Sequence, residues 1–117
     1  MKLSKIFFTT TLFISCAADA AFHCSGKVQS IALGPKGGVL QVDAGFGVHY
    51  LCRIHDRMND VPPEVCRAWF SMLLAAQASG REISQSYNPG DSGAQNCEQL
   101  GSWKVPNPFP YYVALSE

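Results

Sequence analysis

Apolar and polar residues alternate in short stretches along this chain, and such alternation predicts β-strands with one buried face. The stretches are 26–33, 39–43, 46–52, 81–87 and 111–115. A glycine-rich turn at 34–38 separates the first two stretches, and the second and third form a predicted hairpin. Every second side chain from Phe46 to Cys52 shares one face, which predicts an outer-surface position for His49.

A single long helix is predicted next, because apolar residues recur at helical spacing over 65–78. Asp60 is expected to cap its start and Gly80 to end it. The apolar stripe of this helix is wide, since only a narrow polar strip around Arg67 and Ser71 interrupts it. A helix in a small monomer normally shows a broader polar face. We therefore expect a second packing partner for this helix, such as another copy of the chain in a homo-oligomer.

The predicted order is three strands, one helix and two strands, which makes the fold mostly β, of the α+β type. This order occurs in the OB-fold, a five-stranded Greek-key barrel with one long helix between strands 3 and 4. We expect a small OB-fold-like barrel. Other small α+β arrangements share the same order and remain open.

Residues 1–20 have the pattern of an export signal, with Lys2 and Lys5 before an apolar stretch and a small-residue cleavage site ending at Ala20. Residues 21–117 would then form one domain of a secreted or periplasmic protein. A lipoprotein anchored through Cys16 is the weaker alternative. No later stretch offers roughly twenty apolar residues in a row, so membrane insertion of the mature domain is not expected.

The charge of the mature domain is close to neutral. Removal of residues 1–20 leaves seven basic and eight acidic residues, a net charge of about −1. Such a balance gives no basic footprint for nucleic acid or for an anionic membrane surface. Neither is therefore an expected partner.

The mature chain would retain four cysteines, an even number in an exported protein, which predicts two disulfides. Three pairings are possible. We favour Cys52 with Cys66, because this pair joins a strand end to the helix start. The second pair, Cys24 with Cys97, would then hold the first strand near the last. The cysteines lie too far apart for the usual zinc-ligand spacing, so no metal or other cofactor is expected.

Gly90-Asp91-Ser92-Gly93 matches the tetrapeptide around the nucleophile of trypsin-like proteases. That catalytic triad needs two barrels, whereas the mature chain suffices for one small barrel. A turn rich in Gly, Asp and Ser is the simpler interpretation, and enzymatic activity is not expected. His23 would be the third residue of the mature chain, a position that can chelate copper(II) or nickel(II), and we rank this site as a minor alternative.

Several motifs resemble the B subunits of the subtilase-cytotoxin and pertussis-type AB5 toxins. Ser25-Gly26 is similar to the Ser-Gly that opens their first strand. Tyr50-Leu51-Cys52 with Cys66 resembles a strand end bridged to a cysteine a short loop later. A helix that ends at Gly80 and a strand that closes with Tyr87-Asn88-Pro89-Gly90 are similar to their helix and Tyr-x-Pro-Gly strand. The likeness covers roughly two thirds of the mature chain.

The resemblance implies an OB-fold subunit that assembles into a ring around its helices and binds sialylated glycans on its outer surface. In that family the serine opening strand one and the tyrosine before Pro-Gly help to hold the sugar. Ser25 and Tyr87 are therefore the expected ligand-binding residues. Tyr111 and Tyr112 could also stack on a sugar, although as strand neighbours one of them should face inward.

The leading interpretation is a non-enzymatic, toxin-B-subunit-like binding module for cell-surface glycans. The alternative is a periplasmic inhibitor or immunity protein, in which the apolar helix or an exposed strand docks against one protein partner. Both interpretations place the folded domain in an oxidising compartment.

Overall fold

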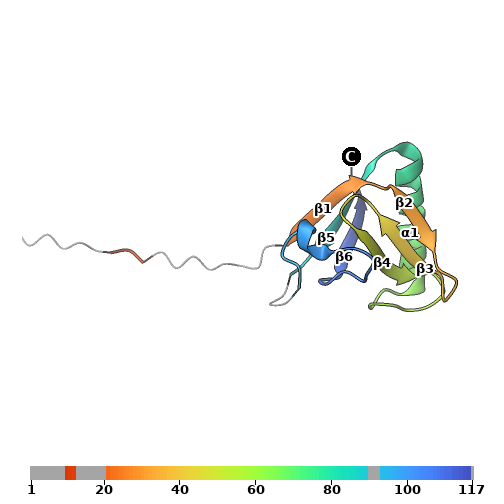
Figure 1. Cartoon of the computed structure of the whole chain (residues 1–117), viewed down its shortest axis with the longest axis horizontal. Helices are drawn as coiled ribbons and strands as arrows, with labels where there is room; N and C mark the ends of the chain where they lie inside the picture. The colour runs from red at the N-terminus through yellow and green to blue at the C-terminus, as the bar shows by residue number, and fades with distance from the viewer. Residues whose placement is uncertain (1–9, 13–20, 90–92, 117) are drawn as a thin grey trace, which may run out of the picture.

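The computed structural model describes residues 10–12, 21–89 and 93–116, and the described part contains six strands and two helical segments (Figure 1). The elements are, in chain order, β1 (Phe22–Lys27), β2 (Ser30–Leu33), β3 (Val39–Asp43), β4 (Val48–Arg53), α1 (Pro63–Ser79), β5 (Glu82–Tyr87), the short 3₁₀ helix η1 (Cys97–Leu100) and β6 (Pro110–Leu115).

The strands form two antiparallel sheets of three strands each. One sheet has the order β1-β5-β6 and the other has the order β2-β3-β4. The chain leaves the first sheet at Val28 and joins the second at once, where the Gln29 N–H donates to the Asp43 carbonyl at 2.8 Å. The predicted single strand over 26–33 is therefore two strands in different sheets.

The prediction of a five-stranded OB-fold barrel is wrong. Six strands are present, and within the described residues no ladder joins β4 to β6 to close the two sheets into a barrel. A single parallel bridge between His49 and Lys104 links β4 to the segment before β6. The helix follows the fourth strand rather than the third, because the first predicted strand is divided.

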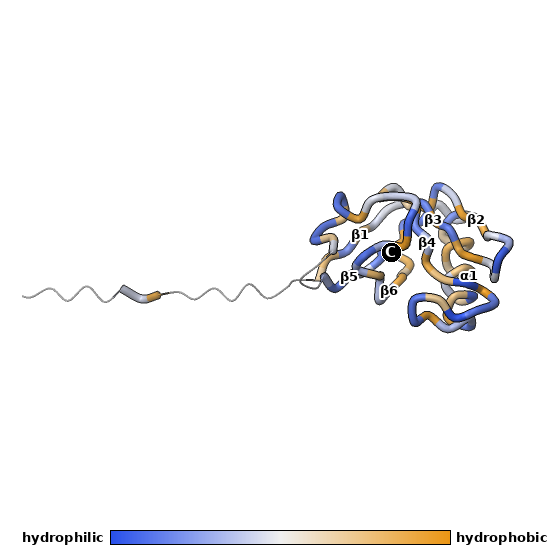
Figure 2. Tube along the Cα trace, turned by 60° about the horizontal axis from the view of Figure 1, so that its bottom comes forward, coloured by the Kyte–Doolittle hydropathy of each residue, from blue (hydrophilic) through white to orange (hydrophobic). Residues whose placement is uncertain are grey.

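The core lies between α1 and the two sheets. Hydrophobic stretches, orange in Figure 2, fall on β3, β4 and α1, whereas β5 is mostly hydrophilic. The helix contacts β4, β5 and β6 and buries Cys66, Leu73 and Ala76 completely. A second, smaller cluster of buried residues lies beside η1 and consists of Cys24, Tyr87, Ala94 and Leu100.

A proline marks the start of the helix and a glycine marks its end. Pro62 occupies the N-cap position without a side-chain hydrogen bond, so the prediction that Asp60 caps the helix is wrong. Pro63 follows at the first helical position, which suits proline because its fixed φ is helical and its missing N–H would have no partner within the helix. Gly80 ends the helix as predicted, with a left-handed φ of 68° and its N–H donating to the Ala76 carbonyl.

Both predicted disulfides are confirmed. Cys24 bonds to Cys97 and Cys52 bonds to Cys66, each with a Cα–Cα distance of 5.7 Å. Two disulfides in so small a domain fit a secreted or periplasmic protein. The expected export signal, including Cys16, lies outside the described residues except for 10–12. No helix in the described part of the chain has the length and apolar character needed to span a membrane.

Candidate functional site

The two expected ligand-binding residues lie on opposite faces of the sheet β1-β5-β6. Ser25 is exposed and pairs with Ser84 across the β1–β5 ladder. Tyr87 is fully buried, and its ring stacks on Phe22 with centroids 4.9 Å apart. Because successive strand residues point to opposite faces, Ser25 and Tyr87 do not form one site.

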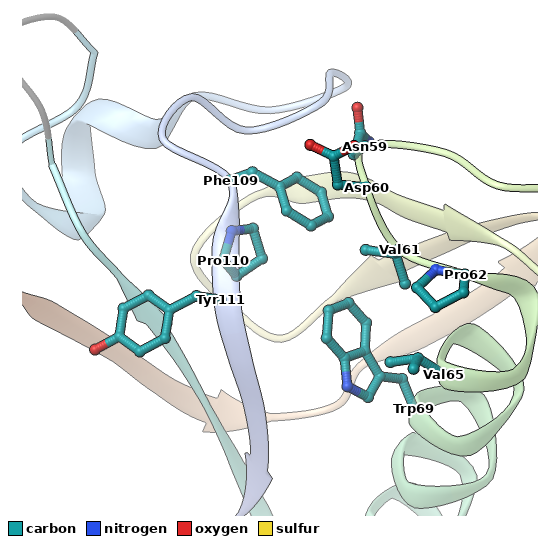
Figure 3. A pocket seen from close by; sticks show the side chains of 9 residues that line it. All are labelled: Asn59, Asp60, Val61, Pro62, Val65, Trp69, Phe109, Pro110 and Tyr111. Carbon is teal, nitrogen blue, oxygen red and sulfur yellow. The ribbon is translucent and has the colours of Figure 1, made fainter.

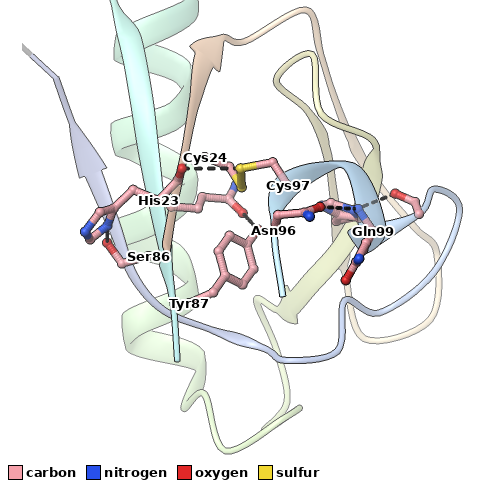
Figure 4. Close-up of a disulfide and its surroundings, with 10 residues drawn as sticks. His23, Cys24, Ser86, Tyr87, Asn96, Cys97 and Gln99 are labelled. Carbon is pink, nitrogen blue, oxygen red and sulfur yellow. Dashed lines mark hydrogen bonds between the residues drawn. A yellow bond between two sulfur atoms is a disulfide. The ribbon is translucent and has the colours of Figure 1, made fainter. Parts of the chain in front are cut away.

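Tyr87 is held from two directions beneath the sheet. Its hydroxyl donates to the Gln85 side-chain oxygen at 2.7 Å, and both residues are buried. Burial raises the pKa of Tyr87 above its usual value. Figure 4 shows the Tyr87 ring on one side of β5, near the Cys24–Cys97 disulfide, and His23 with Ser86 on the other side.

Polar side chains and one aromatic ring gather on the outer face of this sheet. The register aligns His23 with Ser86 and Tyr112, and it aligns Ser25 with Ser84 and Ala114. We define the outer polar face by the five residues among these with polar side chains, which are His23, Ser25, Ser84, Ser86 and Tyr112. Three hydroxyls, one imidazole and one phenol therefore lie side by side on three adjacent strands.

Within the outer polar face one internal hydrogen bond is present among the described residues. The His23 Nδ1 atom and the Ser86 hydroxyl lie 2.7 Å apart (Figure 4). Ser25 and Ser84 form no such bond with their neighbours in the described part of the chain, so their hydroxyls are free to meet a ligand. Each hydroxyl can donate one hydrogen bond and accept two.

Tyr111 and Tyr112 are both exposed, by 51 % and 64 %, so the expectation that one faces inward is wrong. The β5–β6 register shifts between Ser86 and Tyr87, and Tyr111 is the extra residue of this bulge. A bulge interrupts the alternation of strand side chains, which leaves the two tyrosines in an edge-to-face contact with centroids 5.9 Å apart. The aromatic signal was present in the sequence, but the bulge that exposes both rings was not.

A separate cleft of about 350 Å³ opens between the helix start and the start of β6. Its lining combines the turn at Asn59 and Asp60 with apolar side chains, which are Val61, Pro62, Val65, Trp69, Phe109 and Pro110 (Figure 3). Tyr111 lies at its edge, with its hydroxyl pointing away. Trp69 falls within the apolar helical spacing predicted over 65–78, whereas no sequence pattern indicated that Phe109 would face it.

His49 is buried, with 1 % exposure, so the prediction that it lies on the outer surface is wrong. Its Nε2 atom lies 2.9 Å from the Gly101 carbonyl oxygen. Because a carbonyl oxygen can only accept a hydrogen bond, Nε2 carries the ring proton and donates it. Burial lowers the pKa of His49 below its usual value of 6.5, and the nearby positive charge of Lys104 acts in the same direction. The Gly101 hydrogen bond and Asp43 oppose this shift without reversing it.

Two backbone hydrogen bonds reinforce the contact between β4 and the segment 101–104. The Trp103 N–H donates to the Val48 carbonyl at 2.7 Å, and the Tyr50 N–H donates to the Lys104 carbonyl at 3.1 Å. His49 therefore belongs to a structural clasp rather than to an open binding site.

No group of three His, Cys, Asp or Glu residues suited to holding a metal ion occurs in the part of the chain that the structure describes. Ser92, from the protease-like tetrapeptide, lies outside the described residues. The Phe22 and His23 backbone, which a terminal copper chelate would use, is committed to the β1–β5 ladder.

No protein-family model matches this chain, and neither a curated protein nor a solved structure does. The residues and their geometry therefore carry the functional argument.

Proposed function

We propose that this protein is an exported, non-enzymatic binding module that holds a glycan on its outer polar face. The observation that carries the proposal is that the exposed Ser25 hydroxyl, the half-buried Ser84 hydroxyl and the exposed Tyr112 ring share one face of three adjacent strands, with Tyr112 two register positions from the serine pair. A sugar presents hydroxyls on its edges and C–H groups on its faces. Free serine hydroxyls complement the edges, and an exposed aromatic ring complements a face.

A sialylated glycan is the ligand class that we favour. Sialic acid carries a carboxylate, and the same outer face ends in Lys27, two residues along β1 from Ser25. Lys27 is exposed, and His23 lies on the other side of Ser25. The Lys27 ammonium on one side of the Ser25 hydroxyl and the His23 imidazole on the other offer hydrogen-bond partners for an acidic sugar, and hydrogen bonds to charged groups are stronger than neutral ones.

Tyr87 has a supporting part in this proposal. Its stack on Phe22 joins β5 to β1 on the core side of the sheet, and its bond to Gln85 lies within β5. The residue therefore positions the outer polar face without contacting the sugar.

We propose further that the protein is a homo-oligomer. Val65 and Leu74 on α1 remain 38 % and 42 % exposed after the helix has packed on the sheets. Each single glycan site would bind weakly, and several copies in one assembly would combine weak sites into useful avidity. Size-exclusion chromatography with light scattering tests the proposed homo-oligomer, and a monomer at working concentration would refute it.

A glycan array tests the binding proposal. We expect the wild type to bind sialylated glycans, and the Ser25→Ala and Tyr112→Ala variants to lose most of the signal. Tyr112→Phe keeps the ring and should retain most of it. Ser30→Ala, which removes an exposed serine from the other sheet, is the matched control and should bind as the wild type does. An array on which the wild type binds no glycan would refute the proposal.

The second candidate is an inhibitor or immunity protein that binds one protein partner. It is favoured by Trp103 and Val105, which are 65 % and 38 % exposed and lie two residues apart at the end of the clasped segment 101–104 and just after it. Exposed tryptophan is a frequent anchor of protein interfaces. A wild type that binds no glycan, together with a monomeric state, would leave this candidate ahead.

A further inference from the structure

The mouth of the cleft beside the helix start is formed by a rigid turn. Met58 and Val61 exchange backbone hydrogen bonds of 3.3 and 2.9 Å. The two residues between them, Asn59 and Asp60, have φ values of 54° and 60°. Both φ values lie in the left-handed region, which is the requirement of a tight two-residue hairpin turn. The turn therefore defines the backbone from which the Asp60 side chain projects at the cleft.

Two aromatic rings form the walls of the cleft. Phe109, which directly precedes β6, and Trp69, on α1, are far apart in the sequence and both face the cleft, as Figure 3 shows. Both are only partly buried, so their ring faces can still be covered by a ligand. Val61 and Val65 complete an apolar floor. The space would hold a compact apolar group of a few heavy atoms with room to spare.

The Asp60 carboxylate lies at the mouth and faces Phe109 across it (Figure 3). Among the described residues nothing donates a hydrogen bond to this carboxylate or pairs with it. Arg57 is the nearest candidate, but its guanidinium approaches the Asp60 main-chain carbonyl, at 3.5 Å. The positive end of the helix dipole lies close by and is already faced by Glu64 in the first turn.

We propose that this cleft binds a substituted ammonium group, a cation that carries its own apolar substituents. Aromatic faces attract cations through their quadrupole, and a carboxylate at the mouth supplies the opposite charge. A neutral apolar ligand would leave the carboxylate unpaired, and an anion would be repelled by it. A bare inorganic cation would find one carboxylate and no further acidic ligands. The site is independent of the outer polar face and of the glycan proposal.

Ligand titrations followed by Trp69 fluorescence test this proposal. The chain has two tryptophans, so the Trp103→Asn background isolates the signal of Trp69. Asparagine suits that position because Trp103 has a φ of 61°, and Asn tolerates the left-handed region. Choline and tetramethylammonium are the charged probes, and 3,3-dimethylbutan-1-ol, the neutral carbon analogue of choline, is the control. We expect saturable changes with the charged probes and none with the alcohol at equal concentration.

Two variants connect the signal to the cleft. Asp60→Asn keeps a side chain that favours the left-handed turn and removes the charge, so we expect choline binding about fivefold weaker, the loss of one charge contact near a protein surface. Phe109→Leu removes one ring and should weaken choline binding similarly. Asp56→Asn removes an exposed carboxylate outside the cleft and should bind as the background does.

A second pair of probes identifies the source of the ammonium group. Acetyl-trimethyllysine amide represents a modified peptide side chain, and choline represents a lipid or polysaccharide headgroup. Binding of either probe with loss in Asp60→Asn supports the site, and the tighter probe names the source. Absence of saturation by every charged probe, or equal binding of the neutral alcohol, would overturn the proposal. Ser25→Ala, which should lose most of the expected glycan signal and lies outside the cleft lining, should leave choline binding unchanged, so the two proposals can fail separately.

Discussion

Tyr87 stacks on Phe22 beneath the β1–β5 ladder while Ser25, on the same ladder, points to the opposite face. The two residues that resemble the sugar-holding pair of a toxin family thus have different environments. One residue supports the sheet from the core side, and the other faces solvent. We therefore expect substitutions of Tyr87 to change stability and substitutions of Ser25 to change ligand binding.

Tyr87→Phe should destabilise the protein without any direct loss of a ligand contact. The change removes the hydroxyl and leaves the buried Gln85 side-chain oxygen without its partner, at a cost of about 1–3 kcal/mol in the free energy of unfolding. Urea unfolding followed by circular dichroism measures it. Tyr112→Phe, the same change at an exposed position, should alter stability by less than about 0.5 kcal/mol. Equal costs for the two variants would contradict the buried placement of Tyr87.

The Cys24–Cys97 disulfide should contribute about 4 kcal/mol to the free energy of unfolding, because it closes a loop of 73 residues. The Cys52–Cys66 disulfide closes 14 residues and should contribute about 3 kcal/mol. Urea unfolding of the two double-alanine variants against the wild type tests both values. A Cys24→Ala/Cys97→Ala protein as stable as the wild type would show that β1 is held mainly by its ladder.

Stability should fall as the pH drops below about 6.5, because His49 is buried and neutral. Its pKa in the folded state lies below the unfolded value, so the unfolded chain binds the extra proton. The stabilisation is therefore complete above pH 6.5 and is lost progressively as the pH falls toward the folded pKa. His49→Gln, which can still donate to the Gly101 carbonyl, should flatten this dependence in thermal unfolding measured from pH 7.5 down to 5. His55→Gln changes an exposed histidine and should leave it intact.

Gly47→Ala should be far more damaging than Gly80→Ala. A Cβ atom on Gly47 would collide with the Gly101 carbonyl oxygen, and the φ there is 117°, a conformation that residues with a Cβ avoid. Gly80 also has a positive φ, but no atom lies within 4 Å of its added Cβ. We expect about 1 kcal/mol for Gly80→Ala from backbone strain alone, and a substantially larger loss for Gly47→Ala. Similar melting temperatures for the two variants would argue against the tight clasp of 101–104 on β4.

The helix and the disulfides could be predicted from the sequence because their signals are local. Apolar spacing and Gly80 defined the helix, and an even number of cysteines in an exported chain limited the pairings to three. The barrel prediction was wrong because the chain passes from one sheet to the other at Val28 and Gln29. An alternating run reveals that strand structure is present but not that the chain crosses from one sheet to another within it.

The candidate site shows the same division between local and tertiary information. The family resemblance pointed to Ser25 as a ligand-binding residue opening the first strand, and the apolar pattern placed Tyr112 in the last strand. The sequence could not reveal that β5 lies between them, nor that a bulge at Tyr111 turns both tyrosines outward. His49 was misplaced because the apolar residues Phe46, Val48 and Tyr50 were assigned to the buried face, whereas Val48 and Tyr50 are only half-buried and His49 and Leu51 are the buried residues.

The most direct test of the proposed function is an amide-resolved NMR titration of the oxidised protein with 3′-sialyllactose. We expect chemical-shift changes concentrated at His23, Ser25, Ser84, Ser86 and Tyr112, with smaller changes at Tyr87 beneath them. Saturation should disappear in Tyr112→Ala. A spectrum that sialyllactose leaves unchanged, or shifts confined to residues away from the sheet β1-β5-β6, would contradict the claim that the outer polar face holds a glycan.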